Sequence, residues 1–333
     1  YHKHVQADRT VAILKIAAGI AKDGRELPDP KNPRNKIMHK GPRDALRYVV
    51  HKVDNGVVDL GDGDRINHGT LNGLATHLRT AYDRITDGPP QVLGIGITKL
   101  DTTKPSKGYL CGILGYAKHG KTRLMRTWMY NLLCEGKNVM HVTYEQSVEE
   151  ELIFYACMHS YNAAVFGKDK GIPIAAYRDG RLSNAQRNFL YHELIPDLEQ
   201  RKSLPGTLCL RKPEGGWDEV KASARQVNAV TPLDALAVDY LTAVPIPGRG
   251  DQKEYYNSVI QDAKDFALYG LDDPLMVISP FQASRSGWLE AGKSNGEYQP
   301  DAIYMYSQVE KAVDILYYVY NDDTLSKEQA IIV

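Results

Sequence analysis

The sequence has no excess of charge of either sign. Its 333 residues contain 41 Lys and Arg against 41 Asp and Glu, so the formal net charge is zero. Without net positive charge the chain has no global field that attracts nucleic acid, and any such binding must come from local patches or from an assembled channel. The balance therefore excludes a nucleic-acid-binding protein of the strongly basic kind.

Cysteine is scarce, and its spacing excludes two further classes of protein. The four cysteines are far apart, form no C-x-x-C pair and have no histidine at metal-ligand spacing. A disulfide framework and a zinc site are thereby excluded. We expect reduced, mostly buried thiols in a reducing compartment. The four are Cys111, Cys134, Cys157 and Cys209.

Long hydrophobic runs are also missing. No stretch approaches the length of a membrane span, and the N-terminus has no secretory apolar region. We therefore expect a protein that neither enters a membrane nor is secreted, and that works in the cytoplasm or in the nucleic-acid-containing compartment of a host cell. Because the first residue is Tyr1 and not Met, we also expect the chain to be a piece of a longer one.

One motif predicts a nucleotide site. A short apolar run over 109–114 predicts a buried strand, and 123–135 has the character of a helix that Gly136 ends. Between them lies the pattern G-x-x-x-x-G-K-[ST], the phosphate-binding loop of nucleoside triphosphatases. Backbone N–H groups of such a loop and the helix N-terminus converge on one anion. Its residues are Gly115, Tyr116, Ala117, Lys118, His119, Gly120, Lys121 and Thr122.

This motif assigns roles to two side chains. Lys121 is expected to reach the β- and γ-phosphates of ATP, and the Thr122 hydroxyl is expected to ligate Mg²⁺. The cofactors predicted from the sequence are therefore ATP and Mg²⁺.

The chain divides into two predicted parts at the turn-forming stretch 87–90. Residues 1–90 are expected to form a small, mostly helical segment, with a breaker-rich, basic connector over 28–42. The basic residues of that connector either touch phosphates or simply face solvent. From 91 to 333 apolar runs alternate with helical stretches, which is typical of a mostly parallel sheet flanked by helices. The fold class is therefore α/β.

Three polar residues follow apolar runs and are expected to join the phosphate loop. Ligands of open α/β sheets bind at the carboxyl ends of the strands. Glu145 follows the strand predicted over 138–144 and is placed to deprotonate the attacking water, although a carboxylate there could instead cap a helix. Asp239 ends the strand at 235–238 and suits Mg²⁺. Gln282 follows the strand at 275–279 and can hydrogen-bond the γ-phosphate.

From about residue 92 onward the chain resembles the RecA-like motor of the DnaB-type replicative helicases, a family that includes phage and mitochondrial primase-helicases. Six segments resemble that family's motifs in order and spacing. They are the entry segment 94–101, the phosphate loop 115–122, the segment 142–147 with Glu145, the D-Y-L stretch 237–241, the sensor stretch 278–285 and the segment 307–314. The resemblance implies a RecA-like P-loop NTPase core.

The resemblance also implies a ring, normally a hexamer, with ATP between subunits, single-stranded DNA in the central channel and a possible primase or loader as partner. The loops after Asp239 and Gln282 would face the channel, the second one being a predicted polar loop over 286–300. Trp288 either stacks on bases or packs against a neighbouring subunit. The predicted DNA-binding residues are Arg249, Lys253, Arg285, Trp288 and Lys293.

Two departures from the family's pattern keep other functions open. Family members place a trans-acting arginine on the strand that 330–333 begins, so we expect that arginine in a C-terminal continuation, or else slow hydrolysis. The phosphate loop is also bulkier than usual, with Tyr116, Lys118 and His119. Besides a helicase, the sequence allows a RecA- or KaiC-like ATPase that acts as a nucleotide-dependent switch, and a DNA-binding or loading protein without unwinding.

Overall fold

The structure is a computed structural model that divides into two compact units, residues 1–84 and 85–333. It describes residues 16, 18–20, 22–28, 36–40, 92–246, 251–299, 302–303 and 308–321. The predicted helices between 41 and 90 and the predicted strand start at 330–333 lie outside this range.

The described part of the first unit is a helical turn followed by a two-stranded antiparallel sheet. Strand β1 (Arg25–Pro28) pairs with β2 (Lys36–His39) in a register that runs from Arg25↔His39 to Pro28↔Lys36. The prediction of an unstructured connector over 28–42 is therefore wrong at Lys36–His39, because the backbone ladder with β1 holds these residues in a strand.

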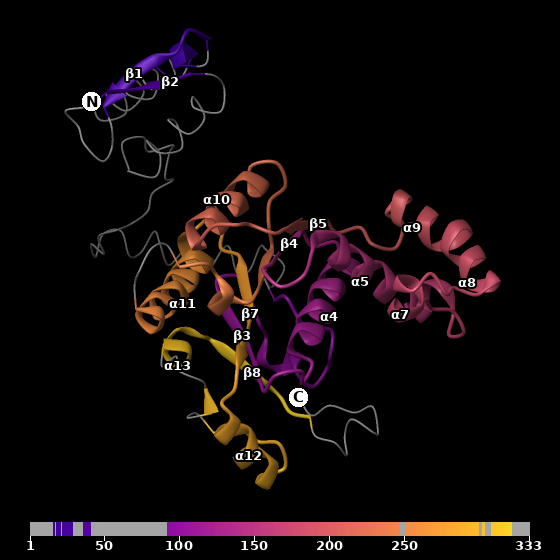
Figure 1. The fold of residues 1–333 in the computed structure, drawn as a ribbon. Coiled ribbons are helices and arrows are strands. Elements are labelled where there is room, and N and C mark those ends of the chain that lie inside the picture. Colours follow the sequence, from indigo (N-terminus) through magenta and orange to yellow (C-terminus); the bar gives the residue numbers. More distant parts are fainter. Residues whose placement is uncertain are drawn as a thin grey trace, which may run out of the picture. The chain divides into compact units, whose positions relative to one another are not determined.

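The second unit is built on one six-stranded sheet whose order is β5-β4-β6-β7-β3-β8 (Figure 1). Every pairing in this sheet is parallel, which confirms the predicted α/β class. The strands are β3 (Leu110–Gly115), β4 (Val139–Thr143), β5 (Leu208–Arg211), β6 (Ala235–Asp239), β7 (Met276–Gln282) and β8 (Ile315–Val319). Strand β7 continues beyond the predicted end at 279, through Pro280, which pairs with Ile113 of β3.

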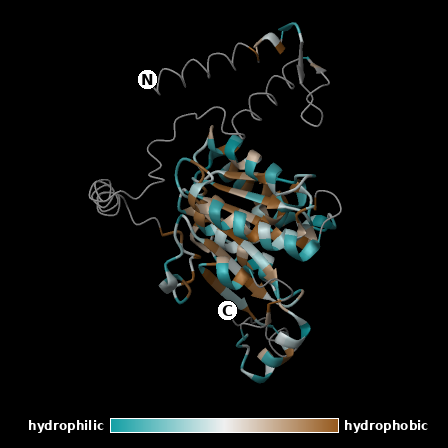
Figure 2. Cartoon of the chain, turned by 90° about the vertical axis from the view of Figure 1, so that its left-hand side faces the viewer, coloured by the Kyte–Doolittle hydropathy of each residue, from teal (hydrophilic) through white to brown (hydrophobic). Residues whose placement is uncertain are grey.

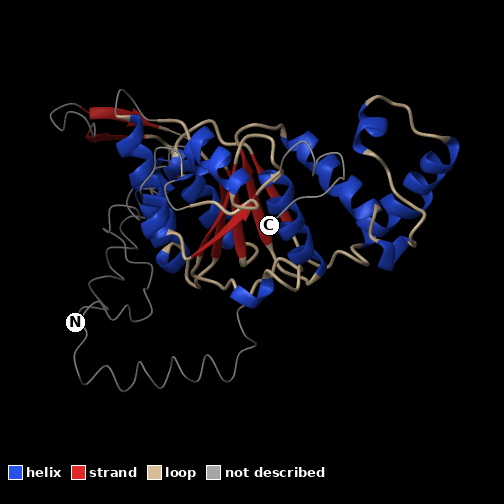
Figure 3. Ribbon diagram, turned by 90° about the horizontal axis from the view of Figure 1, so that it is seen from below, coloured by secondary structure: helices blue, strands red, loops and turns tan. Residues whose placement is uncertain are grey.

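Helices cover both faces of this sheet, as Figure 3 shows. Helices α4 (Lys121–Cys134) and α5 (Val148–Ser160) lie on one face, and α10 (Trp217–Asn228) and α11 (Gln252–Tyr269) lie on the other. Short 3₁₀ turns occur at Asp101–Thr103 and Leu241–Ala243, and α13 (Gln308–Ala312) precedes β8. None of the described helices is both long and apolar enough to cross a membrane.

Successive side chains of the strands enter different halves of the core. In β3, Leu110 and Leu114 pack on the side of α10 and α11, whereas Cys111 and Ile113 pack on the side of α4. Strand side chains alternate between faces, so a strand covered on both sides must be apolar throughout. Figure 2 shows the central strands coloured largely as hydrophobic and much of the outer helical surface as hydrophilic. All four cysteines are free thiols.

A helical insertion between α5 and β5 stands to one side of the sheet (Figure 1). It contains α6 (Ala163–Phe166), α7 (Ile174–Arg178), α8 (Asn184–Phe189), a π-helical turn (Leu190–Leu194) and α9 (Ile195–Gln200). Its apolar side chains form a small core of their own, to which Ile172, Phe189 and Leu194 contribute. The charged helix predicted over 184–201 is thus present, with a π turn in its middle.

The polar loop predicted over 286–300 is wrong for most of its length, because Arg285–Lys293 forms helix α12. The Ser284 side chain caps its N-terminus by accepting a hydrogen bond from the Gly287 backbone N–H. Gly287 and Ala291 are buried. Tertiary packing of these small residues therefore outweighs the low intrinsic helix propensity of a segment that contains two glycines and a serine.

Candidate nucleotide-binding site

The phosphate loop lies where the sequence predicts it, between β3 and α4. Gly115 ends β3 and has no room for a side chain, because an added Cβ would lie 2.6 Å from the backbone oxygen of Val319. Gly120 has a φ of 95°, a conformation that favours glycine, and Lys121 begins α4. Both glycines of the motif are therefore required by the backbone path that turns the strand into the helix.

Lys121 is held over the loop by its own backbone. Its Nζ donates a hydrogen bond to the carbonyl oxygen of Tyr116 at 2.9 Å. Burial lowers the pKa of Lys121 to about 8, and the carboxylates of Asp239 and Glu145 oppose this shift. A partly desolvated ammonium attracts an anion more strongly than one in water, because the local dielectric constant is lower. The position suits the charge of a triphosphate.

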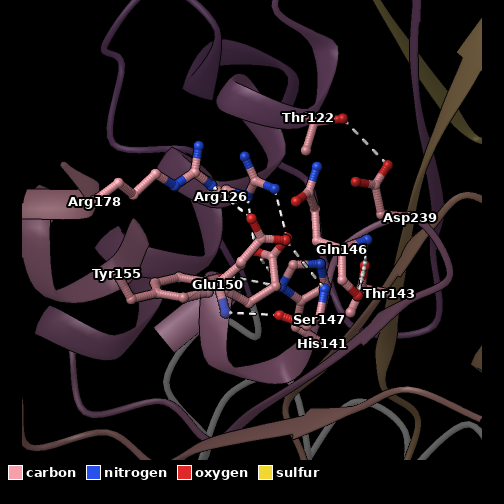
Figure 4. A network of polar contacts seen from close by, with 11 residues as sticks. Thr122, Arg126, His141, Thr143, Gln146, Ser147, Glu150, Tyr155, Arg178 and Asp239 are labelled. Carbon is pink, nitrogen blue, oxygen red and sulfur yellow. Dashed lines mark hydrogen bonds and ion pairs between the residues drawn. The ribbon is translucent and has the colours of Figure 1, made fainter. Parts of the chain in front are cut away.

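Thr122 and Asp239 meet at the carboxyl edge of the sheet. The Thr122 hydroxyl donates to Asp239 Oδ1 at 3.2 Å, and the Asp239 carboxylate is fully buried (Figure 4). Its other oxygen, Oδ2, makes no hydrogen bond to any described residue. Burial, and next the Glu145 carboxylate, raise the pKa of Asp239 to about 6. A buried carboxylate oxygen without a donor, beside a hydroxyl, fits the oxygen ligands that Mg²⁺ requires.

Glu145 is exposed just beyond β4, and its role as a helix cap is excluded. The residue that caps α5 is Ser147, whose hydroxyl accepts from the Glu150 N–H, while the Glu150 side chain accepts from the Ser147 N–H. Glu145 acts electrostatically on its neighbours, because burial and this carboxylate raise the pKa of Tyr240. The Glu145 carboxylate thus lies on the solvent side of the site, beside Asp239 and Lys121.

Gln282 lies next to the phosphate loop. It is the last residue of β7, it is exposed, and it is the register partner of Gly115 in β3. The following backbone N–H, of Ala283, donates to the Gly115 carbonyl oxygen at 3.0 Å. The structure therefore brings the neighbourhoods of Gln282 and the loop together, although the two positions are far apart in sequence.

A buried ion pair behind this site has no counterpart in the sequence analysis. Arg126 of α4 donates to both oxygens of Glu151 in α5, at 2.8 and 2.5 Å. Beneath it, His141 Nδ1 lies 3.2 Å from the Tyr155 hydroxyl, and burial lowers the pKa of His141 to about 3 (Figure 4). No local motif marks such a pair, because its partners are on different helices.

The predicted DNA-binding residues are in different settings. Arg249 lies outside the described residues. Lys253 is exposed in the first turn of α11, and Arg285 is exposed in the first turn of α12. Lys293 is exposed and forms an ion pair with Glu290 at 2.7 Å. The Trp288 ring is stacked on Tyr116 of the phosphate loop, with centroids 4.9 Å apart and planes 10° apart.

Comparison with solved structures identifies the fold as that of the RecA-like ATPase domain of DnaB-type helicases. The chain is similar to a solved helicase ATPase domain, at 18% identity and a TM-score of 0.60, over 79% of this chain and 87% of that one. It is also similar to a DnaB-like replicative helicase solved for its interactions with primase, at 14% identity and a TM-score of 0.64. That match covers 98% of this chain and 68% of the helicase chain. No protein-family model and no curated protein matches the chain.

Proposed function

We propose that the protein is an ATP-dependent, ring-forming motor that translocates on single-stranded DNA and unwinds duplex DNA. The observation that carries the proposal is the pairing of Thr122 with a buried Asp239 at the mouth of the phosphate loop, 3.2 Å apart. These are the two protein groups that hold Mg²⁺ in P-loop ATPases. The fold, shared with helicase ATPase domains, supports the choice of a motor.

The proposed reaction is hydrolysis of ATP at this site. The loop N–H groups and Lys121 bind the phosphates, and Thr122 and Asp239 hold Mg²⁺, which neutralises phosphate charge when bound. Glu145 orients the attacking water and accepts its proton. Gln282 hydrogen-bonds the γ-phosphate and, through Ala283, responds at Gly115 when that group leaves. Each role uses a residue that the parallel sheet brings to the same edge.

Binding of DNA is proposed to arise on assembly. A chain of zero net charge offers a monomer little positive surface for counterion release. A homo-oligomer, a hexamer in this proposal, would bring several copies of Arg285, Lys293 and Lys253 to one axis, with Arg249 as a further candidate. A primase or loader is a possible partner, as the DnaB-like neighbour was solved for its interactions with primase.

Salt titrations of single-stranded DNA binding, with and without a non-hydrolysable ATP analogue, test this proposal. We expect binding to require the analogue and to weaken steeply with salt. The double variant Arg285→Ala/Lys293→Ala should bind more weakly. The slope of log K against log salt should shrink by about 0.7 for each DNA phosphate that the variant no longer neutralises.

A matched control is Arg187→Ala/Lys202→Ala, which removes two exposed cations of the helical insertion. It should leave both the affinity and the salt slope unchanged. Binding of DNA that is independent of nucleotide, or an equal effect of both double variants, would contradict the proposal.

One observation favours a second candidate, a nucleotide-dependent switch or loading protein that does not translocate. The Trp288 ring is engaged with Tyr116 of its own chain, which leaves one of its faces unavailable for stacking on bases. In a switch, DNA would change the nucleotide affinity without DNA-dependent turnover.

A further inference from the structure

Large aromatic side chains in the phosphate loop are not explained by nucleotide binding. Such a loop binds phosphate through backbone N–H groups, which any residue but proline supplies. Here Tyr116 and His119 contact residues outside the loop. Tyr116 stacks on Trp288 of α12, and the His119 ring lies edge-on to the same indole at 5.7 Å. His119 Nδ1 also accepts a hydrogen bond from the Asn321 backbone N–H at 3.3 Å.

Trp288 is fixed from its own side as well. Its Nε1 donates to the carbonyl oxygen of Asn321 at 3.4 Å, just beyond β8. One residue earlier, Gly287 packs so closely on Ala302 that an added Cβ would lie 2.4 Å from that residue's Cβ. Helix α12 is therefore seated on the body of the domain, and the indole reaches from it to the loop.

The position of Tyr116 bears directly on Lys121. The Tyr116 carbonyl oxygen accepts from Lys121 Nζ at 2.9 Å, and the Tyr116 N–H donates to the Tyr298 hydroxyl at 3.3 Å. The backbone that orients the phosphate-binding ammonium thus belongs to the residue whose ring is stacked on Trp288. An aromatic stack and a hydrogen bond, in series, connect α12 with Lys121.

We propose that Trp288 is a positioning residue for the nucleotide site. Its stack on Tyr116 holds the phosphate loop in the conformation that receives phosphates, and so links nucleotide binding to the placement of α12. This inference rests on the proposed nucleotide site. Because coupling between two sites is reciprocal, whatever binds the exposed Arg285 and Lys293 of α12 changes the affinity of the loop for ATP.

A double-mutant cycle on the full-length chain tests the stack, with the dissociation constant of a fluorescent ATP analogue and Mg²⁺ as the readout. An aromatic pair contributes enough that Trp288→Ala should weaken binding by about two- to tenfold. Tyr116→Ala should weaken it similarly. The double variant should bind no more weakly than the weaker single variant, because the pair acts as a unit.

Conservative and control variants separate positioning from general stability. Trp288→Phe retains a stacking ring and should bind within about twofold of wild type, whereas a merely structural indole would not be rescued. Leu289→Ala, which trims the exposed neighbour in α12, should change nothing. The intrinsic fluorescence change on adding Mg²⁺ and ATP should be lost in Trp288→Phe, since Trp128 and Trp217 are buried away from the loop.

Strictly additive effects of the two alanine variants on binding would overturn the inference, as would a Trp288→Phe variant as weak as Trp288→Ala. If Trp288→Ala fails to fold, Trp288→Phe and Tyr116→Leu carry the test, with loss of affinity expected only in the second. Wild-type protein that binds no nucleotide would overturn the proposed site itself, and this inference with it. Wild-type affinity in all the stack variants, together with loss of binding in Lys121→Ala, would overturn the inference alone.

Discussion

Lys121 and Asp239 carry opposite charges in one partly buried site, and burial moves their pKa values toward each other. The pKa of Lys121 falls to about 8 and that of Asp239 rises to about 6. Between these values both groups are in the charged form that binding of phosphate and Mg²⁺ requires. Below pH 6 Asp239 is increasingly protonated, and above pH 8 Lys121 is increasingly neutral.

Binding of Mg²⁺ and ATP should therefore be linked to protons in opposite directions at the two limits. Near pH 6 the metal displaces a proton from Asp239, so protons are released. Near pH 8 the phosphates favour the ammonium form of Lys121, so protons are taken up. Calorimetry in buffers of different ionisation enthalpy measures both. The release at the acidic limit should be smaller in Asp239→Asn, and equal release in the two proteins would contradict the role given to Asp239.

The Glu145 carboxylate is the proposed base, and it can be tested apart from binding. Glu145→Gln should bind Mg²⁺ and ATP as wild type does but lose hydrolysis by about two to four orders of magnitude, the usual contribution of a general base. Single-turnover cleavage of ATP gives the rate. The control is Glu149→Gln, a residue in the first turn of α5, which should keep the wild-type rate. Similar rates in both variants would remove Glu145 from the mechanism.

Among the elements, α4 and α5 are joined by one buried pair. Arg126 is almost fully buried and Glu151 completely so, and their double hydrogen bond lies beside the strand that carries His141. The Arg126 guanidinium also lies 4.1 Å from the centre of the Phe154 ring. Because α4 begins at Lys121 and α5 follows Glu145, this pair fixes the two helices that position the proposed catalytic groups.

Removing one partner should destabilise the domain strongly. Glu151→Ala leaves a buried guanidinium without its carboxylate, which costs about 3–5 kcal/mol of unfolding free energy. Glu149→Ala in the same helix should cost less than about 0.5 kcal/mol. Replacing both partners, as in Arg126→Met/Glu151→Leu, should recover much of the loss. Chemical denaturation measures all three, and a Glu151→Ala variant as stable as wild type would refute the account of this pair.

The elements also show what the sequence can predict. Strands β3, β4 and β6 follow from the sequence within a residue or two, because a strand buried on both faces is apolar throughout and polar residues end it. The capping box at Ser147 is predictable because its residues are local. Helix α12 is not, since Gly287 and Ala291 are helical only through packing on the rest of the domain. The stack of Tyr116 on Trp288 joins positions far apart in the chain, and no local pattern signals it.

At the scale of the whole molecule, the balanced charge and the fold make opposite suggestions about DNA. Zero net charge argues against binding by a single chain, whereas the fold is shared with the ATPase domain of a DnaB-like replicative helicase. The proposed assembly reconciles them, because it concentrates cations on one axis without changing the net charge of the chain. Hydrolysis should then depend on both ATP and DNA.

The rate of ATP hydrolysis by the full-length chain, with and without single-stranded DNA, tests this account most directly. We predict a rate that rises when single-stranded DNA is added and that is abolished in Lys121→Ala, under conditions in which sedimentation shows the assembled oligomer and the variant keeps the wild-type melting temperature. The same rate with and without DNA in the assembled protein, or unchanged turnover in Lys121→Ala, would contradict it.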